Sequence, residues 1–359
     1  MLLLTGFPGF IGSQLLPRLL AQEPELVAVC LIQRTHADLA RRILKQLDAP
    51  GLGLTRRVHL VEADITRAGL ALADTTLMPQ VTDVWHLAGV YDTVAPRELA
   101  ERVNVDGTRH LLAVAAELPG LRRFNHVSTC YVSGDFPGEF GEDNLDVGQG
   151  FHSVYDETKF AAEVHVRQAI ADGLPATVYR PAAVVGDSRT GWTQKFDGPY
   201  FVIQFVLRQP RGLAIVPRFT DPSKAYFNIV PIDFLVDALA ALSMRDDNVG
   251  RTYQVADPAQ TSIADIVRAI ADATGRRAVW VPLPLQPVKA LDRLPGVRGL
   301  IQIPAPAFDY LTSTTTYSSG HTQTDLDGAG VTCPRFADYV GRLIAYRQAH
   351  PEVTSTAMV

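Results

Sequence analysis

Three glycines near the N-terminus constrain the fold of this chain more than any other feature. They lie in the segment Thr5-Gly-Phe-Pro-Gly-Phe-Ile-Gly12, between a short apolar run and a helical pattern. A glycine-rich turn between a strand and a helix exposes backbone N–H groups that can hold a pyrophosphate at the helix N-terminus. Gly6 permits the tight turn, Gly9 lets the backbone approach a phosphate, and Gly12 lets the helix pack on the strand. The expected cofactor contacts in this turn are Gly6, Phe7, Pro8, Gly9, Phe10, Ile11 and Gly12.

Apolar runs of strand length alternate with helical patterns through the first half of the chain. The sequence predicts strands at 2–4, 26–32, 58–62, 83–87, 123–128 and 177–179, and helices at 13–22, 37–47, 96–118 and 154–172. Strands that alternate with helices indicate βαβ units, so we expect an α/β fold with a Rossmann-type, doubly wound parallel sheet. Ligands of such a sheet bind beyond the carboxyl ends of its strands.

The regular alternation stops after Gly186. Residues 187–225 mix glycine, proline and aromatic residues, whereas a strand-like run and an apolar helix return at 226–256. We therefore expect a nucleotide-binding domain at 1–186, joined by 226–256, and a smaller C-terminal substrate-binding lobe made of 187–225 and 257–350. Residues 351–359 are expected to form a tail. A helix at 334–350 is expected to close the lobe, because apolar residues recur at helical spacing: Phe336, Tyr339, Val340, Leu343 and Ile344.

Composition argues against several classes of function. The 359 residues have a formal net charge of -5 and no block of lysine and arginine interleaved with aromatic residues, so we expect no nucleic-acid partner. No run of about 18 apolar residues occurs, so no membrane-spanning helix is expected. Cys30, Cys130 and Cys333 show no metal-ligand spacing and suggest a reducing compartment. Because the first strand leads directly into the glycines, we expect no cleavable leader and predict a cytoplasmic location.

Residues that follow the next strands suggest which dinucleotide binds. Arg34 stands at the end of the second strand, where an acidic residue usually meets the ribose of NAD and an arginine suits the 2′-phosphate of NADP. Arg34 therefore favours NADPH (NADP+). Asp64 and Ile65, after the third strand, are expected beside the adenine. The fourth strand ends in a segment that is expected to leave room for the cofactor: Leu87, Ala88 and Gly89.

Tyr155 and Lys159 are the strongest candidates for catalysis. They are four residues apart in a helical pattern and therefore lie on the same face of a helix. A phenol has a pKa of about 10, too high for proton exchange at neutral pH, and a neighbouring cation lowers it by stabilising the phenolate. Lys159 is also expected to bind the ribose on the nicotinamide side. Thr129, after the fifth strand, is expected to donate a hydrogen bond to the substrate oxygen.

These motifs resemble those of the extended short-chain dehydrogenase/reductase family over most of the chain. The matching segments are 5–12, 86–89, 126–134, 155–159 and 180–181. The resemblance implies an NAD(P)-dependent oxidoreductase with Thr129, Tyr155 and Lys159 as catalytic residues and no metal. It also implies that Pro181 and Val184 lie against the nicotinamide. Many members of the family pair through helices that flank the catalytic strand, so the resemblance leaves both a monomer and a homodimer open.

Within this family the chain most resembles the thioester reductases, which include fatty acyl-CoA reductases (male-sterility-type NAD-binding members) and terminal domains of carboxylic acid reductases. The supporting segments are 31–34, 126–129 and 185–191. The resemblance implies NADPH-dependent reduction of an acyl thioester, linked to CoA or to a carrier, or of the derived aldehyde. Two alternatives stay open. One is an NADP-dependent alcohol dehydrogenase or ketone reductase acting on an apolar, hydroxysteroid-like substrate. The other is a non-catalytic NADP-sensing regulator, although such regulators commonly lack the tyrosine–lysine pair.

The substrate side of the site is less clear in the sequence. An apolar wall for a lipophilic acyl or ring substrate is one interpretation of the aromatic and aliphatic residues that follow residue 195. The other interpretation is that these residues form the core of the lobe. Both interpretations concern the same set: Phe196, Tyr200, Phe201, Ile203, Phe205, Val206 and Leu207.

Overall fold

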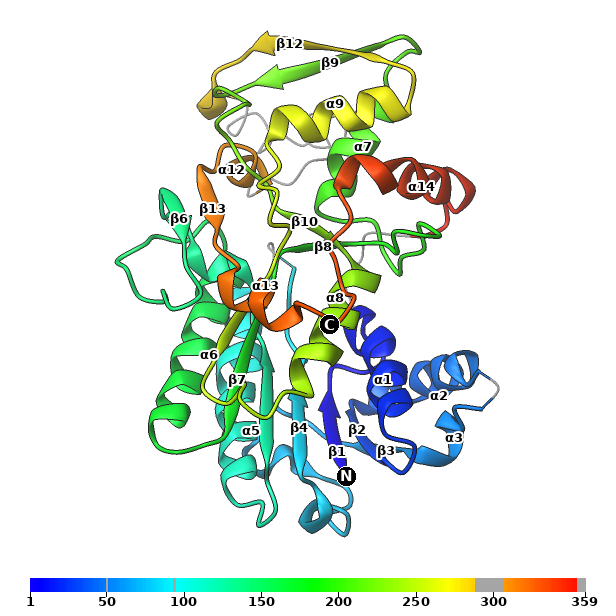
Figure 1. Cartoon of the computed structure of the whole chain (residues 1–359), viewed down its shortest axis with the longest axis vertical. Coiled ribbons are helices and arrows are strands. Elements are labelled where there is room, and N and C mark those ends of the chain that lie inside the picture. The colour runs from blue at the N-terminus through cyan, green and yellow to red at the C-terminus, as the bar shows by residue number, and fades with distance from the viewer. Residues whose placement is uncertain (50, 93–94, 288–306, 354–359) are drawn as a thin grey trace.

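Seven parallel strands form the central sheet, in the order β11-β7-β5-β4-β1-β2-β3 (Figure 1). The computed structural model describes residues 1–49, 51–92, 95–287 and 307–353. The predicted α/β fold with a parallel, doubly wound sheet is confirmed. The strand order reverses between β1 and β4, which is the switch point where ligands of such sheets bind. The strands are β1 (Leu2–Thr5), β2 (Ala28–Ile32), β3 (Val58–Glu62), β4 (Asp83–His86), β5 (Arg123–Val127), β7 (Ala176–Pro181) and β11 (Thr252–Val255).

Helices cover both faces of the sheet because successive strand residues point to opposite sides. Leu2 and Leu4 belong to the core on one face, and Leu3 and Val29 belong to the core on the other. The first core is covered by α1 (Phe10–Gln22), α2 (Ala37–Leu47) and α8 (Ile232–Ser243). The second is covered by α5 (Gly107–Ala116) and α6 (Val154–Ala171).

The helix predicted at 96–118 consists of three parts. It begins with α4 (Arg97–Ala100), continues through a π-helical segment, Glu101–Asp106, and ends with α5. Asn104 lies in the π-helical segment and is buried. Its amide donates to the Val90 carbonyl and to Thr158 Oγ1, each at 2.9 Å, and its oxygen accepts from Val90 N at 2.7 Å. Asn104 therefore supports the packing of strand and helix.

The C-terminal lobe lies beyond one end of the sheet, above it in Figure 1. Its main elements are α7 (Pro199–Leu207), β9 (Leu213–Arg218), α9 (Ile263–Ala273), β12 (Arg277–Pro282) and α14 (Phe336–Ala349). Their apolar residues share one core. All the residues predicted on the buried face of the closing helix are in that core: Phe336, Tyr339, Val340, Leu343 and Ile344.

Several later elements of the chain pack on the sheet or form small sheets beside it. β8 (Ala183–Val185) pairs with β10 (Ile229–Pro231), β11 pairs with β7, and α8 packs on α1. β13 (Thr315–Tyr317) pairs with β6 (Gly138–Phe140), and α13 (Gly320–Leu326) packs on β11 and α8. β13 and α13 therefore lie with the sheet although they fall within 257–350, the range expected for the lobe. The carboxylate of Glu142 helps to hold them there, because it accepts from His321 N at 2.6 Å and Thr322 N at 3.1 Å.

Parts of two predicted segments, 288–306 of the lobe and 354–359 of the tail, lie outside the described residues. None of the helices in the described part of the chain combines the length and apolarity that crossing a bilayer requires. The three cysteines are free.

Candidate active site

One continuous cavity of about 800 Å³ extends from the glycine turn into the lobe. All seven predicted residues of the turn, Gly6 to Gly12, line it. Gly6 has a φ of 85°, which favours glycine. A Cβ atom on Gly9 or Gly12 would lie 2.7 or 2.6 Å from the Gly6 carbonyl oxygen. The turn therefore requires glycine at these positions, and it leaves a backbone cradle at the start of α1 that fits a dinucleotide.

The segment after β4 is held against this turn by a side chain of β1. Thr5 Oγ1 accepts hydrogen bonds from the N–H groups of Leu87 at 3.2 Å and Ala88 at 3.1 Å. Leu87, Ala88 and Gly89 all line the cavity, as does Thr5. The position that the sequence predicted for these three residues is therefore fixed by a threonine that the sequence analysis did not single out.

His86 completes this arrangement and is neutral. Its Nδ1 lies 2.9 Å from Thr5 Oγ1, and its Nε2 lies 3.0 Å from Thr108 Oγ1. Thr108 donates its own proton to the Asn104 carbonyl at 2.6 Å, so Nε2 must donate and Nδ1 must accept. Burial, and then the charge of Lys159, lower the pKa of His86 to about 3. In the sequence, His86 was noted only as part of a matching segment. The signal that could have identified it is a polar residue that follows apolar residues at the end of a strand.

Of the two residues expected beside the adenine, Ile65 lines the cavity but Asp64 does not. The Asp64 carboxylate accepts from the backbone N–H of Thr66 at 2.9 Å and from its hydroxyl at 2.6 Å. The bond from this hydroxyl is the main cause that lowers the pKa of Asp64. Aspartates in turns commonly bond the backbone two residues on. Asp64 therefore caps its own turn, and its contact with adenine stays a prediction.

Arg34 is exposed at the start of a 3-10 turn, Arg34–His36, that follows β2. Its side chain does not line the cavity, whereas Gln33 and His36 do. The 2′-phosphate contact of Arg34 therefore stays a prediction, and His36 is an additional neighbour of the same site.

Thr129, Tyr155 and Lys159 line the same part of the cavity. α6 begins at residue 154, so Tyr155 lies in its first turn and Lys159 one turn further along. Tyr155 is hydrogen-bonded to Thr129, and Lys159 Nζ donates to the Val127 carbonyl at 2.7 Å. The structure thus brings together, at the carboxyl end of β5, the three side chains that the sequence proposed for catalysis.

Burial controls the ionisation of these groups. It raises the pKa of Tyr155 above its ordinary value, and the hydrogen bond with Thr129 acts in the other direction. The net lowering that the sequence predicted from Lys159 is therefore absent in this structure, in which burial is the largest influence on the pKa of Tyr155. Burial also lowers the pKa of Lys159 to about 8, with the charge of Glu163 opposing. Tyr155 is held as a protonated phenol, the form that a proton donor needs.

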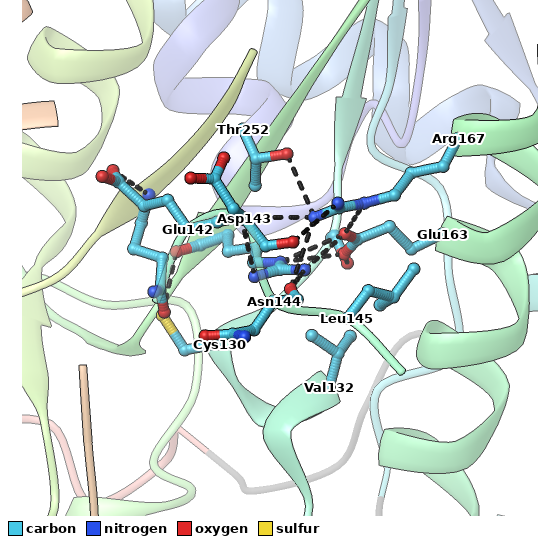
Figure 2. Close-up of polar contacts among 12 residues, drawn as sticks. Cys130, Val132, Glu142, Asp143, Asn144, Leu145, Glu163, Arg167 and Thr252 are labelled. Atoms are coloured by element: carbon cyan, nitrogen blue, oxygen red, sulfur yellow. Dashed lines mark hydrogen bonds and ion pairs between the residues drawn. The ribbon is translucent and has the colours of Figure 1, made fainter. Parts of the chain in front are cut away.

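A buried ion pair lies beneath these side chains. Arg180 Nη2 is 2.7 Å from Glu163 Oε1, and neither side chain is exposed. Figure 2 shows the Glu163 carboxylate of α6 among these contacts, beside the loop 142–145. Ser128 Oγ donates to Glu163 Oε2 at 2.6 Å. The hydroxyl of Ser128 thus bonds the ion pair. The hydroxyl that bonds Tyr155 belongs to Thr129, the residue predicted from the sequence.

The cavity continues into the lobe between apolar side chains. Phe201 and Phe205 of α7 line it, and Val216 of β9 and Trp280 of β12 line its part within the lobe. The two sequence interpretations of this region therefore both apply, to different residues. Phe196, Tyr200, Ile203 and Val206 belong to the buried core of the lobe, and Leu207 packs against it.

The segment from the end of β7 to α7 lines the cavity. Pro181 of β7 and Val184 of β8 line it, where the family resemblance places the nicotinamide. Lys195, in the loop between β8 and α7, has its Nζ 3.3 Å from the centroid of the Tyr91 ring, and both residues line the cavity. This contact between two loops was not predicted, because nothing in the local sequence of either residue indicates the other.

The fold and this site together define an extended short-chain dehydrogenase/reductase, a class of NAD(P)-dependent oxidoreductases. A family model described as "Male sterility protein" matches residues 4–239. The chain belongs to this family of NAD-binding domains, and its cofactor is a nicotinamide dinucleotide.

Solved structures agree with this assignment. The terminal R domain from the myxalamid PKS-NRPS biosynthetic pathway has a TM-score of 0.80 and 25% identity, over 98% of this chain and 90% of that domain. A thiolation-reductase di-domain from an archaeal non-ribosomal peptide synthetase has a TM-score of 0.76 over 98% of this chain and 76% of the di-domain. Its identity is 19%, so this second likeness concerns the fold alone.

Curated relatives are longer than this chain. Nonribosomal peptide synthetase asaC of Aspergillus flavus is 29% identical over 280 residues, which are 73% of this chain and 26% of asaC. Fatty acyl-CoA reductase wat of Drosophila melanogaster is 26% identical over 333 residues, covering 78% of this chain and 62% of that protein. The chain therefore spans less than two thirds of the length of each.

Proposed function

We propose that the protein reduces acyl thioesters with NADPH and that the acyl chain is apolar and linked to CoA or to a carrier. The main support is the continuity of the cavity, which leads from Tyr155 into an apolar extension within the lobe. A thioester carbonyl beside Thr129 and Tyr155 would place its acyl chain in this extension. The likeness to a terminal R domain and to a fatty acyl-CoA reductase supports the same substrate class. The derived aldehyde is a second substrate of the same site.

The chemistry follows from the three polar side chains. NADPH supplies the hydride when it is bound. Thr129 donates a hydrogen bond to the substrate oxygen, and Tyr155 transfers its phenolic proton to that oxygen as charge develops there. The ammonium of Lys159 stabilises the phenolate that remains. The hemithioacetal then collapses: its hydroxyl proton returns to the phenolate, the C–S electron pair leaves with sulfur, and the products are an aldehyde and a thiolate.

A substrate panel with NADPH tests the proposal. With dodecanoyl-CoA we expect NADPH oxidation together with release of free CoA thiol. We expect Tyr155→Phe to lower kcat at least about 100-fold while the Kd for NADPH stays within about twofold, because the phenol's oxygen serves chemistry rather than cofactor affinity. NADPH oxidation with ketones or sterols alone, without thiol release from any acyl-CoA or carrier-linked acyl thioester, would contradict the proposal.

NADPH rather than NADH is proposed from Arg34. A charge-assisted hydrogen bond to a phosphate contributes about 1.5–3 kcal/mol, which corresponds to at least about tenfold in affinity. Arg34→Asp should therefore weaken NADPH by at least that factor and change NADH much less. Equal weakening of both cofactors would remove the phosphate contact.

A ketone reductase acting on rigid apolar substrates is a second candidate. Tyr131, Phe227 and Tyr310 line the cavity and lie in ring contact with one another. Such an aromatic wall also suits a fused-ring substrate. The panel above separates the two candidates, since a ketone substrate releases no thiol.

A further inference from the structure

The hydroxyl of Tyr310 connects the lobe side of the cavity to the catalytic helix. It donates to Asp156 Oδ1 and Oδ2 at 2.9 and 2.8 Å and lies 3.1 Å from Ser153 Oγ. Tyr310 is the last residue of α12 (Ala307–Tyr310), whereas Ser153 is the N-cap of α6 and Asp156 is in its first turn. Asp156 directly follows Tyr155. The contact therefore joins a distant segment to the turn that carries the proposed proton donor.

Helix capping accounts for only part of this contact. Ser153 Oγ accepts from Asp156 N at 3.2 Å, and the Asp156 carboxylate accepts from the backbone of Ser153 and His152, as in a capping box. A capping carboxylate can remain solvated, but Asp156 is 0% exposed. Burial raises the pKa of Asp156 to about 7, although the hydrogen bonds from Tyr310 and Ser153 oppose it. A cap does not require this burial, nor a phenol from another part of the chain.

The ring of Tyr310 extends the contact toward the substrate oxygen site. Its centroid lies 5.0 Å from that of Tyr131, in an edge-to-face arrangement, and 6.4 Å from that of Phe227. These three rings, which we call the aromatic wall, line the cavity. Tyr131 N in turn donates to Thr129 Oγ1 at 3.3 Å. Tyr310 thus contacts the turn of Tyr155 through its hydroxyl and the neighbourhood of Thr129 through its ring.

We propose that Asp156 and Tyr310 are positioning residues, whose hydrogen bond holds the aromatic wall against the first turn of α6. A carbonyl group between this wall and Thr129 then meets the phenol of Tyr155. The inference rests on the proposed function for the identity of the substrate, but any carbonyl reduced at Tyr155 needs the same placement. Loss of the bond leaves the cofactor cradle and Lys159 unchanged. Misplacement by about 1 Å can lower a rate by about 100-fold, so the effect belongs to kcat rather than to cofactor affinity.

Three substitutions isolate the bond. Tyr310→Phe removes the donor and Asp156→Ala removes the acceptor. Asp156→Asn keeps the shape of the side chain and one acceptor oxygen. We expect the first two to lower kcat by about 10- to 30-fold, less than the full cost of misplacement, with the Kd for NADPH within about twofold. Asp156→Asn should keep most of the activity. The Tyr310→Phe/Asp156→Ala double variant should be no slower than the slower single variant, because Asp156→Ala already removes the bond that Tyr310→Phe removes.

Tyr317→Phe is the matched control. The Tyr317 hydroxyl lies 3.1 Å from Ser133 Oγ and also joins distant parts of the chain, but Tyr317 is not among the residues that line the cavity. Tyr317→Phe should therefore leave kcat unchanged. An equal loss of kcat in Tyr317→Phe, or losses that multiply in the double variant, would show a general effect of lost hydrogen bonds and would overturn the positioning role.

Hydrogen exchange of the intact protein with NADPH gives a readout that needs no turnover. Tyr310→Phe should accelerate amide exchange in residues 153–157 and 308–313 and leave 5–12 unchanged. If the wild-type protein reduces no acyl thioester, whether linked to CoA or to a carrier, the proposed function fails, and the kinetic comparison proceeds with whichever aldehyde or ketone it reduces. Unchanged exchange in both segments would overturn the inference whatever the substrate.

Discussion

Glu163→Gln removes one charge from an ion pair in which neither side chain is exposed to solvent. Arg180 Nη2 and Nε lie 2.7 and 3.2 Å from Glu163 Oε1, and Nε lies 3.1 Å from Oε2. Removing one partner of a buried pair costs about 3–5 kcal/mol, because the other charge stays buried. Glutamine keeps one acceptor oxygen, and Arg180 keeps the carbonyls of 141, 142 and 144. We therefore expect the lower end of that range, a loss of about 3 kcal/mol in the free energy of unfolding.

The same helix supplies a matched control. Glu157 pairs with Arg97 through two hydrogen bonds of 2.9 and 2.7 Å, but these side chains are 43% and 50% exposed. Glu157→Gln should cost no more than about 1 kcal/mol, because solvent screens an exposed pair. Urea unfolding followed by circular dichroism and fluorescence gives both values by linear extrapolation, provided that the two transitions coincide.

Equal losses of stability in the two variants would refute the reasoning that burial controls the contribution of the pair. The pH dependence gives a second check. Burial acts to raise the pKa of Glu163, but the charge and hydrogen bonds of Arg180, with the charge of Arg167 and the hydrogen bond from Ser128, outweigh it, and the net pKa is lowered. The contribution of the pair is therefore present above the unfolded pKa of the carboxyl group and is lost as pH falls through the folded pKa. The difference in stability between wild type and Glu163→Gln should shrink as the pH is lowered from neutrality.

Three further predictions concern activity. The pKa of about 8 for Lys159 predicts that kcat/KM falls as pH rises through 8, because the ammonium is lost. A pH–rate series that stays flat to pH 9.5 would contradict this. Gly9→Ala should weaken NADPH at least about tenfold by fluorescence titration, since its Cβ would lie 2.7 Å from the Gly6 carbonyl and the cradle must shift. Gly320→Ala, where a Cβ meets nothing within 4 Å, is the control and should bind normally. Trp280→Ala should raise the ratio of kcat/KM for hexadecanoyl-CoA over dodecanoyl-CoA by enlarging the cavity in the lobe, whereas the exposed neighbour Val279→Ala should leave that ratio unchanged.

Much of the fold could be predicted because its signals are local. The spacing of three glycines predicts a strand–turn–helix cradle, since Gly9 and Gly12 meet the carbonyl of Gly6 within the same seven residues and Gly6 itself has a positive φ. Tyr155 and Lys159 meet on one helix face because helical periodicity alone brings residues four apart together. Phe336 and Leu343 mark the buried face of the closing helix for the same reason.

Tertiary structure decided the features that depend on segments far apart in the chain. Asp64 and Arg34 are different, because their places outside the cavity lining have local causes: the Asp64 carboxylate bonds Thr66 in its own turn, and Arg34 is exposed. The ionisation of Tyr155 also differs from the prediction, since burial is a property of the assembled core. The bond between Asp156 and Tyr310 joins residues 154 positions apart, and no local pattern encodes a contact at that separation. Sequence by itself determined the sheet, the cradle and the chemical groups, and folding decided what surrounds them, because desolvation and packing arise only when distant segments meet.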